Sequence, residues 1–167
     1  YAFVMEGTFQ DIQQKLPELR ELGINTIWLQ PIFKTTWGEQ GYDVIDYFNI
    51  RSDYGSESDL QNLIKSAHTL EMKVLLDIVI NHTSIYHPYA QHSIEYGSTS
   101  HYYDYYQRKI DDAPYSQYYN YYKGFINYFW DELPNLNYDN PEVRNWMMTA
   151  CKYWVEKFDI DGYRFDA

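Results

Sequence analysis

The run Lys73–Ile80 (KVLLDIVI) constrains the fold of this chain more than any other segment. After its first residue it is continuously apolar except for Asp77. Runs of this kind are typical of parallel strands that are covered on both faces. Asp77 would be buried in such a strand, and a buried carboxylate needs either a partner or a chemical task.

Strand-like and helix-like segments alternate along the chain. Four apolar segments indicate strands: Tyr1–Met5, Ile24–Leu29, Lys73–Ile80 and Ile160–Phe165. Apolar residues at helical spacing lie between them, in Asp11–Leu22, in a segment from Ser56 to about Leu70, and in Asn140–Phe158. This alternation predicts an α/β fold with a parallel sheet and right-handed crossovers.

Capping signals indicate where the helices begin and end. Ser56 begins a capping-box pattern, and Asn140 is a favourable N-cap because Pro141 follows it at the first helical position. Gly23 is the expected stop residue of the first helix. Pro17 lies inside that helix, and we expect it to kink the helix or to shift its start.

The residues 81–138 are too many and too polar for a short loop, and they are rich in tyrosine. Long loops without structure of their own are uncommon in compact domains. We therefore expect an inserted subdomain over 81–138, on the carboxyl-terminal side of the sheet. The surrounding domain would consist of 1–80 and 139–167.

The segment Asp161–Ala167 (DGYRFDA) places Arg164 two positions before Asp166. In a strand, these two side chains point to the same face. A neighbouring guanidinium keeps a carboxylate ionised at neutral pH, and an ionised aspartate at the end of a strand is a plausible nucleophile. A purely structural ion pair explains the same residues, so the segment by itself leaves both interpretations open.

The composition argues against several classes of partner. The chain has 13 Lys and Arg against 24 Asp and Glu, a net charge of −11, so we expect no nucleic-acid partner. No apolar run approaches membrane-spanning length, and we expect no membrane partner. The spacings of glycine-rich nucleotide-binding loops and of zinc sites are absent from the sequence. A secreted and a cytoplasmic location both remain open.

Five segments together resemble the α-amylase family of glycoside hydrolases, in the order that the family has them. They are Gly23–Pro31 (GINTIWLQP), Gly41–Tyr47 (GYDVIDY), Asp77–His82 (DIVINH), Leu133–Asn137 (LPNLN) and Gly162–Asp166 (GYRFD). The resemblance implies a (β/α)8 barrel with its active site at the carboxyl ends of the strands. This chain would supply strands one to four, with the inserted subdomain after the third strand.

The resemblance also implies a retaining mechanism on α-glucosidic linkages of starch-like glucans or malto-oligosaccharides, through a covalent glycosyl-enzyme. Asp166 matches the family's nucleophile, and Arg164 is expected to orient it and keep it ionised. Asp77 would accept hydrogen bonds from Arg164. The family's general-acid glutamate and second aspartate follow later strands, so we expect this chain to be a fragment that is inactive alone.

The same matches assign substrate and metal roles. Tyr42 is expected to stack on a sugar ring, Asp43 to hold the end of a short substrate, and His82 to donate to a sugar hydroxyl. Asn81 matches a calcium ligand of many relatives. Many of those relatives have an aspartate where this chain has Asn135, and the lost charge weakens the case for calcium.

The sequence leaves several alternatives open. Hydrolysis and glycosyl transfer share the covalent intermediate and differ only in what attacks it. A non-catalytic relative that uses the barrel for binding or protein association is another interpretation, although the intact Arg164 and Asp166 count against it. An unrelated half-barrel binding module would need polar or covered sheet edges, whereas the expected strands are apolar.

Overall fold

The computed structural model describes residues 7–36, 40–108 and 120–166, and the expected strand Tyr1–Met5 lies outside these ranges. The first part contains helix α1 (Phe9–Glu21), strands β1 (Thr26–Leu29), β2 (Phe33–Thr35) and β3 (Val44–Ile50), helix α2 (Glu57–Thr69) and strand β4 (Lys73–Val79). Helix α3 (Pro88–Tyr96), two short 3-10 turns, Gly97–Thr99 and Tyr103–Tyr105, and strands β5 (Asn120–Tyr122) and β6 (Phe125–Asn127) follow. Helix α4 (Pro141–Phe158) and strand β7 (Gly162–Asp166) complete the described chain.

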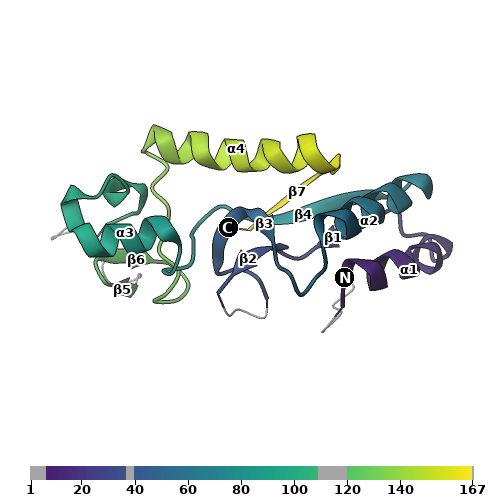
Figure 1. Cartoon of the computed structure of the whole chain (residues 1–167), viewed down its shortest axis with the longest axis horizontal. Helices are drawn as coiled ribbons and strands as arrows, with labels where there is room; N and C mark the ends of the chain where they lie inside the picture. Colours follow the sequence, from purple (N-terminus) through teal and green to yellow (C-terminus); the bar gives the residue numbers. More distant parts are fainter. Residues whose placement is uncertain (1–6, 37–39, 109–119, 167) are drawn as a thin grey trace.

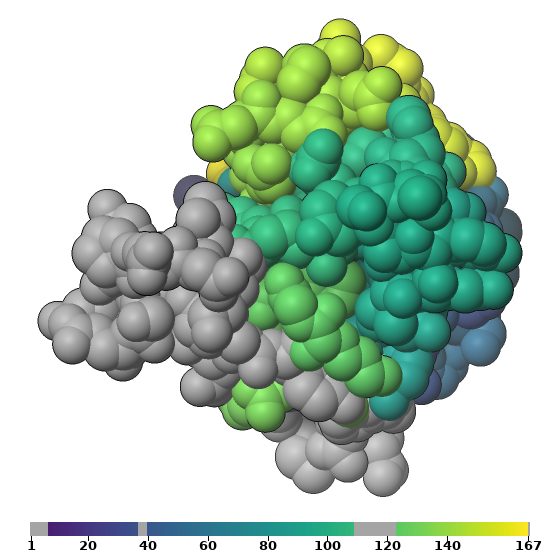
Figure 2. All heavy atoms as spheres, turned by 90° about the vertical axis from the view of Figure 1, so that its left-hand side faces the viewer, coloured from purple at the N-terminus to yellow at the C-terminus, as the bar shows by residue number. Residues whose placement is uncertain are grey.

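The central sheet is parallel, with strand order β1-β4-β7. Helices α1 and α2 lie together at one end of the molecule, whereas α3, β5 and β6 lie at the other, and α4 runs alongside both parts (Figure 1). The predicted α/β class with a parallel sheet is confirmed. Viewed from the end that holds α3, residues of α3 and of the segment leading into α4 lie side by side on the surface (Figure 2).

The capping signals are confirmed, whereas the expected shift of the first helix's start to Pro17 is wrong. Ser56 forms a complete capping box at the start of α2, and Asn140 accepts a hydrogen bond from the amide of Glu142 at the start of α4. Helix α1 begins slightly earlier than expected because Thr8 forms a second capping box. Pro17 lies well inside α1, so it does not set the start of the helix, and a kink at Pro17 stays a prediction.

Apolar faces of α2 and α4 cover the sheet. The buried residues of these faces are Leu60, Leu63, Ile64 and Ala67 on α2, and Val143, Met147, Ala150, Trp154 and Phe158 on α4. Trp154 is fully buried, and its indole Nε1 donates to the carbonyl oxygen of Tyr47 at 2.8 Å. This bond ties α4 to β3, which lies outside the parallel sheet.

The chain between Pro31 and Ser56 contains an antiparallel hairpin, β2–β3, which the sequence pattern does not predict. Strand β2 is only three residues long, and its pairing with β3 shifts register twice. The buried residues of β3, Val44 and Tyr47, are three positions apart rather than two. The usual sequence signal of a half-buried strand is strict alternation of apolar and polar residues. Because the buried residues of β3 do not alternate in this way, the sequence pattern does not reveal the hairpin.

The beginning of the segment 81–138 pairs with its end. His82 forms an antiparallel bridge with Asn135, and Tyr106 forms one with Leu136. The described part of the segment contains α3, two 3-10 turns and the hairpin β5–β6. The expectation of some regular structure here is therefore confirmed, while the boundaries of a subdomain stay a prediction.

Asp161 connects the start of β7 to the start of β4. Its Oδ2 accepts from the amide of Val74 at 2.8 Å and lies 2.9 Å from Nε2 of His68, and its Oδ1 accepts from Nζ of Lys73 at 2.8 Å. Burial alone would raise the pKa of Asp161, but these hydrogen bonds lower it to about 2. The ionised carboxylate is thus an integral part of the folded structure.

We predict that Asp161→Asn lowers the free energy of unfolding by about 1–2 kcal/mol near pH 7, because charge-assisted hydrogen bonds are lost. The folded-state pKa lies below the unfolded value of about 3.9, so this stabilisation is complete above about pH 5 and disappears as the pH falls towards 2. Urea unfolding of both proteins across this pH range measures the difference.

Asp159→Asn is the matched control, because the Asp159 side chain is 95% exposed and asparagine tolerates its positive φ of 60°. It should change stability little at any pH. A difference between Asp161→Asn and the unchanged protein that stays constant down to pH 2 would contradict the assigned role of the ionised carboxylate.

Candidate active site

The register of the parallel sheet brings three predicted site residues together. Asp77 on β4 is directly opposite Arg164 on β7, and Val79 is opposite Asp166. Because side chains alternate along a strand, Asp77, Arg164 and Asp166 share one face of the sheet. The opposite face of β4 carries the buried Leu76 and Ile78.

A single nitrogen of Arg164 contacts both carboxylates. Nη1 donates to Oδ1 and Oδ2 of Asp77 at 3.1 Å each, and to Oδ1 of Asp166 at 2.6 Å. The Asp77 side chain is completely buried, whereas that of Asp166 is 18% exposed and that of Arg164 is 38% exposed. The arginine therefore links a buried carboxylate to one that solvent or a ligand can reach.

Asp77 has a second donor in Tyr42, whose hydroxyl lies 3.1 Å from Oδ2. Burial raises the pKa of Asp77, and the hydrogen bonds from Arg164 and Tyr42 oppose that rise. Burial and the nearby carboxylate of Asp77 raise the pKa of Tyr42, so its hydroxyl stays protonated and can donate. The sequence analysis expected Tyr42 only as a stacking residue, and this hydrogen bond is an additional role.

His82 is buried directly behind Tyr42. Its Nε2 lies 3.1 Å from the carbonyl oxygen of Tyr42, and its Nδ1 lies 3.1 Å from Nδ2 of Asn81. Burial lowers the pKa of His82, so the ring is neutral near pH 7, with Nε2–H donating and Nδ1 accepting. Both nitrogens already have protein partners, so the predicted bond to a sugar hydroxyl would have to share or replace one of them.

Tyr47 fixes the turn that carries His82. Its side chain is 1% exposed, and its hydroxyl lies 2.8 Å from the carbonyl oxygens of both Val79 and His82, so it can donate to either. The turn after β4 is thereby held against β3. Tyr47 belongs to the segment Gly41–Tyr47, whose sequence pattern does not predict this contact.

Asp43, the residue after Tyr42, binds Thr36 directly after β2. Its Oδ2 accepts from the backbone amide and the hydroxyl of Thr36, at 3.1 and 2.6 Å. Gly41 is required before Tyr42, because its φ is +84° and a Cβ there would lie 2.6 Å from the carbonyl oxygen of Pro31. A substrate contact by Asp43 stays a prediction, since its carboxylate supports the protein backbone here.

Within the described residues, the contacts of Asn81 are to amide groups and to the His82 ring, and no carboxylate contacts it. Nδ2 of Asn81 lies 3.4 Å from Oδ1 of Asn135, which also accepts from the amide of Tyr128 at 3.1 Å. Calcium favours several oxygen ligands, usually including carboxylates. The described residues contain no group of three or more His, Cys, Asp or Glu that could hold a metal. Calcium at Asn81 stays a prediction.

Trp28 is a further residue of this site that the sequence motifs did not single out. The guanidinium carbon of Arg164 lies 5.0 Å from the centre of the Trp28 ring system, in a cation–π geometry. The sequence signal for it is the alternation in β1, where Ile27 and Leu29 are buried on the opposite face.

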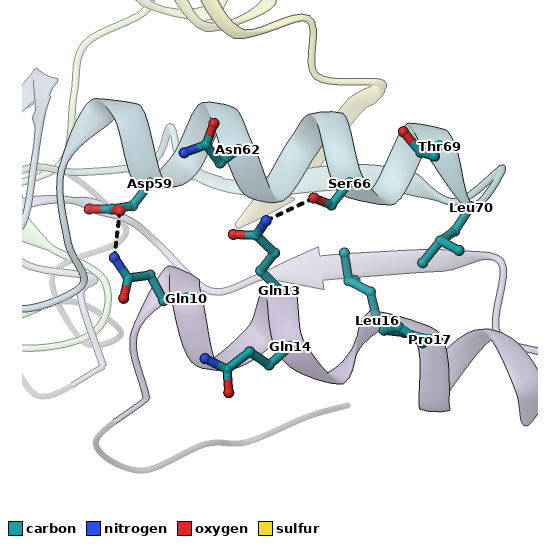
Figure 3. Close-up of a pocket in the computed structure, with 10 residues that line it drawn as sticks. All are labelled: Gln10, Gln13, Gln14, Leu16, Pro17, Asp59, Asn62, Ser66, Thr69 and Leu70. Atoms are coloured by element: carbon teal, nitrogen blue, oxygen red, sulfur yellow. Dashed lines mark hydrogen bonds between the residues drawn. The ribbon is translucent and has the colours of Figure 1, made fainter.

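A separate surface pocket lies between α1 and α2 and contains none of the predicted site residues (Figure 3). Amide and hydroxyl side chains line it, and Gln13 Nε2 donates across it to Ser66 Oγ at 2.8 Å. Gln10 Nε2 likewise donates to Asp59 Oδ1 at 2.8 Å. These bonds join the two helices, so the pocket is part of the polar contact between α1 and α2.

No helix in the described ranges is long and apolar enough to cross a membrane.

Comparisons with known proteins point to one family. The family model for the catalytic domain of alpha amylase matches residues 4–167. The chain is 39% identical over 163 residues to alpha-amylase 3 of Dictyoglomus thermophilum, covering 96% of this chain and 32% of that protein. It is 34% identical over 174 residues to a probable oligo-1,6-glucosidase 3 of Bacillus subtilis, covering 96% of this chain and 31% of that protein.

Solved structures agree with these matches. The crystal structure of the alpha-amylase from H. orenii superposes with a TM-score of 0.84 at 35% identity, over 99% of this chain and 37% of that chain. This chain therefore spans about a third of the length of the relatives that it matches.

The contacts of Tyr47 give a test of how the site is held together. We predict that Tyr47→Phe lowers the free energy of unfolding by about 1–3 kcal/mol, because it leaves buried carbonyl oxygens without their donor. Denaturant titration measures the change. Tyr86→Phe is the matched control, since Tyr86 is 46% exposed and should lose little. Equal losses in the two variants would show that the buried hydroxyl does not fix the turn.

Proposed function

This chain belongs to the alpha-amylase family of glycoside hydrolases, and we propose that it carries part of the active site of a retaining glycosidase or transglycosidase. The proposed substrates are α-glucosidic linkages in starch-like glucans or malto-oligosaccharides. Support comes from the match to the family's catalytic-domain model and from relatives named as an amylase and an oligo-1,6-glucosidase. Hydrolysis and transfer both remain compatible with this proposal.

The observation that carries the proposal is the environment of Asp166. Arg164 binds one oxygen of this carboxylate, Oδ1, and within the described ranges no hydrogen bond occupies Oδ2. A retaining enzyme needs a carboxylate oxygen that attacks the anomeric carbon while the rest of the group is held in place. Oδ2 of Asp166 would form the bond to the anomeric carbon, and the bond from that carbon to the leaving oxygen would break.

Arg164 and Asp77 would support this step without touching the reacting carbon. The guanidinium balances the charge of Asp166 before attack, and the buried Asp77 holds the guanidinium through Nη1. Water or an acceptor sugar would then release the glycosyl group from Asp166. Protonation of the leaving oxygen requires a general acid about 5–5.5 Å from the nucleophile. The family match assigns that role to no residue of this sequence.

We also propose how the chain is divided between a barrel and an inserted subdomain. Strands β1, β4 and β7 would be the second, third and fourth strands of a (β/α)8 barrel, with 1–80 and 139–167 as barrel and 81–138 as the inserted subdomain. The parallel order of these strands and the bridge between His82 and Asn135 support this division. The sugar-binding side of the site would be formed by Tyr42, whose hydroxyl donates to Asp77, together with Asp43 and His82. Asp43 follows Tyr42 in the sequence, and His82 contacts the carbonyl oxygen of Tyr42.

We predict that Asp166→Asn abolishes turnover in the protein that carries this chain, because an amide cannot form the glycosyl-enzyme, while sugar binding largely persists. Steady-state hydrolysis of a nitrophenyl maltoside gives kcat, and calorimetry with a malto-oligosaccharide gives the binding affinity. Asp139→Asn, at an exposed position beyond Asn135, is the matched control and should leave both values unchanged. A near-normal kcat in Asp166→Asn would refute the assignment of the nucleophile.

We also predict that a polypeptide of these 167 residues alone does not turn over the same substrate measurably. General acid catalysis contributes about 10²–10⁴-fold, and here a nucleophile would face an unprotonated leaving group. The assay compares the purified polypeptide with its Asp166→Asn variant. Turnover that exceeds that of the variant would show that these residues contain a working acid.

A further inference from the structure

Trp28 lies on the face of the sheet that carries the candidate site. In β1, Ile27 and Leu29 are 9% and 6% exposed and pack into the core, so Trp28 points to the other face. Trp28 pairs with Leu75 on β4, which in turn pairs with Gly162 on β7. This row lies two residues before the row that contains Asp77 and Arg164, and it therefore faces the same way.

The side chains of Trp28 and Arg164 meet across the intervening strand β4. Strands β1 and β7 are not neighbours, and each spacing measures about 4.8 Å, so their backbones are roughly 10 Å apart. The guanidinium carbon of Arg164 nevertheless lies 5.0 Å from the Trp28 ring centre. The facing position on β7 is Gly162, which has no side chain of its own to fill this space. Only a large side chain on β1 can reach the guanidinium from there.

Arg164 needs a second constraint because its hydrogen bonds converge on one atom. Nη1 alone contacts Asp77 and Asp166, and in the described part of the chain Nε and Nη2 form no hydrogen bond. An arginine that binds carboxylates through two nitrogens has a fixed plane. One that binds through a single nitrogen can pivot about it. A ring system beneath the guanidinium restricts that pivot, and tryptophan provides the strongest cation–π contact of the aromatic residues.

We propose that Trp28 is a positioning residue, which sets the plane of the Arg164 guanidinium and through it the orientation of the Asp166 carboxylate. This inference rests on the proposed function of Asp166 as the nucleophile. It gives Trp28 no contact with the substrate, so its loss should change the rate of the chemical step more than the affinity for sugar. A packing residue would instead change stability and leave kcat of the folded enzyme unaffected.

The test uses Trp28→Leu and Trp28→Phe in the protein that carries this chain, with kcat expressed per correctly folded active site. Because cation–π contacts are modest, we expect Trp28→Leu to lower kcat roughly three- to thirtyfold with KM nearly constant, and Trp28→Phe to recover a large part of the loss. An unchanged kcat in Trp28→Leu, or an equal loss in both variants, would overturn the proposal.

Fluorinated tryptophans separate electrostatics from packing if Trp28→Leu folds poorly. Stepwise fluorination weakens the ring's attraction for cations while changing its size little, so kcat should fall with each fluorine at position 28. The same series at Trp146 is the control, because Trp146 packs against other rings, including those of Tyr47 and His87, and within the described residues no Lys or Arg lies over its ring. A flat series at position 28 would overturn the proposal, as would equal slopes at both positions.

The parallel Asp166→Asn variant separates the two proposals. If Asp166→Asn is inactive while Trp28 variants keep full kcat, only the role of Trp28 is wrong. If Asp166→Asn keeps its turnover, the nucleophile assignment is wrong, and the inference about Trp28 fails with it.

Discussion

The site depends on one nitrogen atom, Nη1 of Arg164, which contacts both Asp77 and Asp166. A completely buried carboxylate is costly unless a charge and hydrogen bonds compensate it, so Asp77 requires this arginine. The same arginine also binds Asp166, whose side chain is 18% exposed, at the end of its strand. The register between β4 and β7 makes this geometry possible, because it places Asp77 directly opposite Arg164.

The elements outside the parallel sheet support that contact. The hairpin β2–β3 contributes the Tyr42 hydroxyl to Asp77 and the Tyr47 hydroxyl to the turn after β4. Helix α4 in turn holds β3 through the bond from Trp154 to the carbonyl of Tyr47. A chain of hydrogen bonds thus runs from the packed core to the two carboxylates. Substitutions far from Asp166 in the sequence should therefore affect how it is oriented.

The sequence predicted the parts of this arrangement that depend on local patterns. Alternation along the strands was sufficient to place Arg164 and Asp166 on one face, and the apolar run around Asp77 predicted its burial. Contacts between distant segments could not be predicted in the same way. The bond from Tyr42 to Asp77 spans 35 positions, and its geometry depends on a hairpin with irregular register. The contact between Trp28 and Arg164 is likewise not predictable from local patterns, because the two residues belong to strands that are not neighbours in the sheet.

The most direct test of the central claim is covalent trapping. The protein that carries this chain would be incubated with an activated fluoroglucosyl fluoride, digested, and its peptides analysed by mass spectrometry. We expect one glycosyl group on the peptide that contains Asp166, bound through an ester to that side chain. A label on Asp77 or on any other carboxylate, with Asp166 unmodified, would contradict the proposed mechanism.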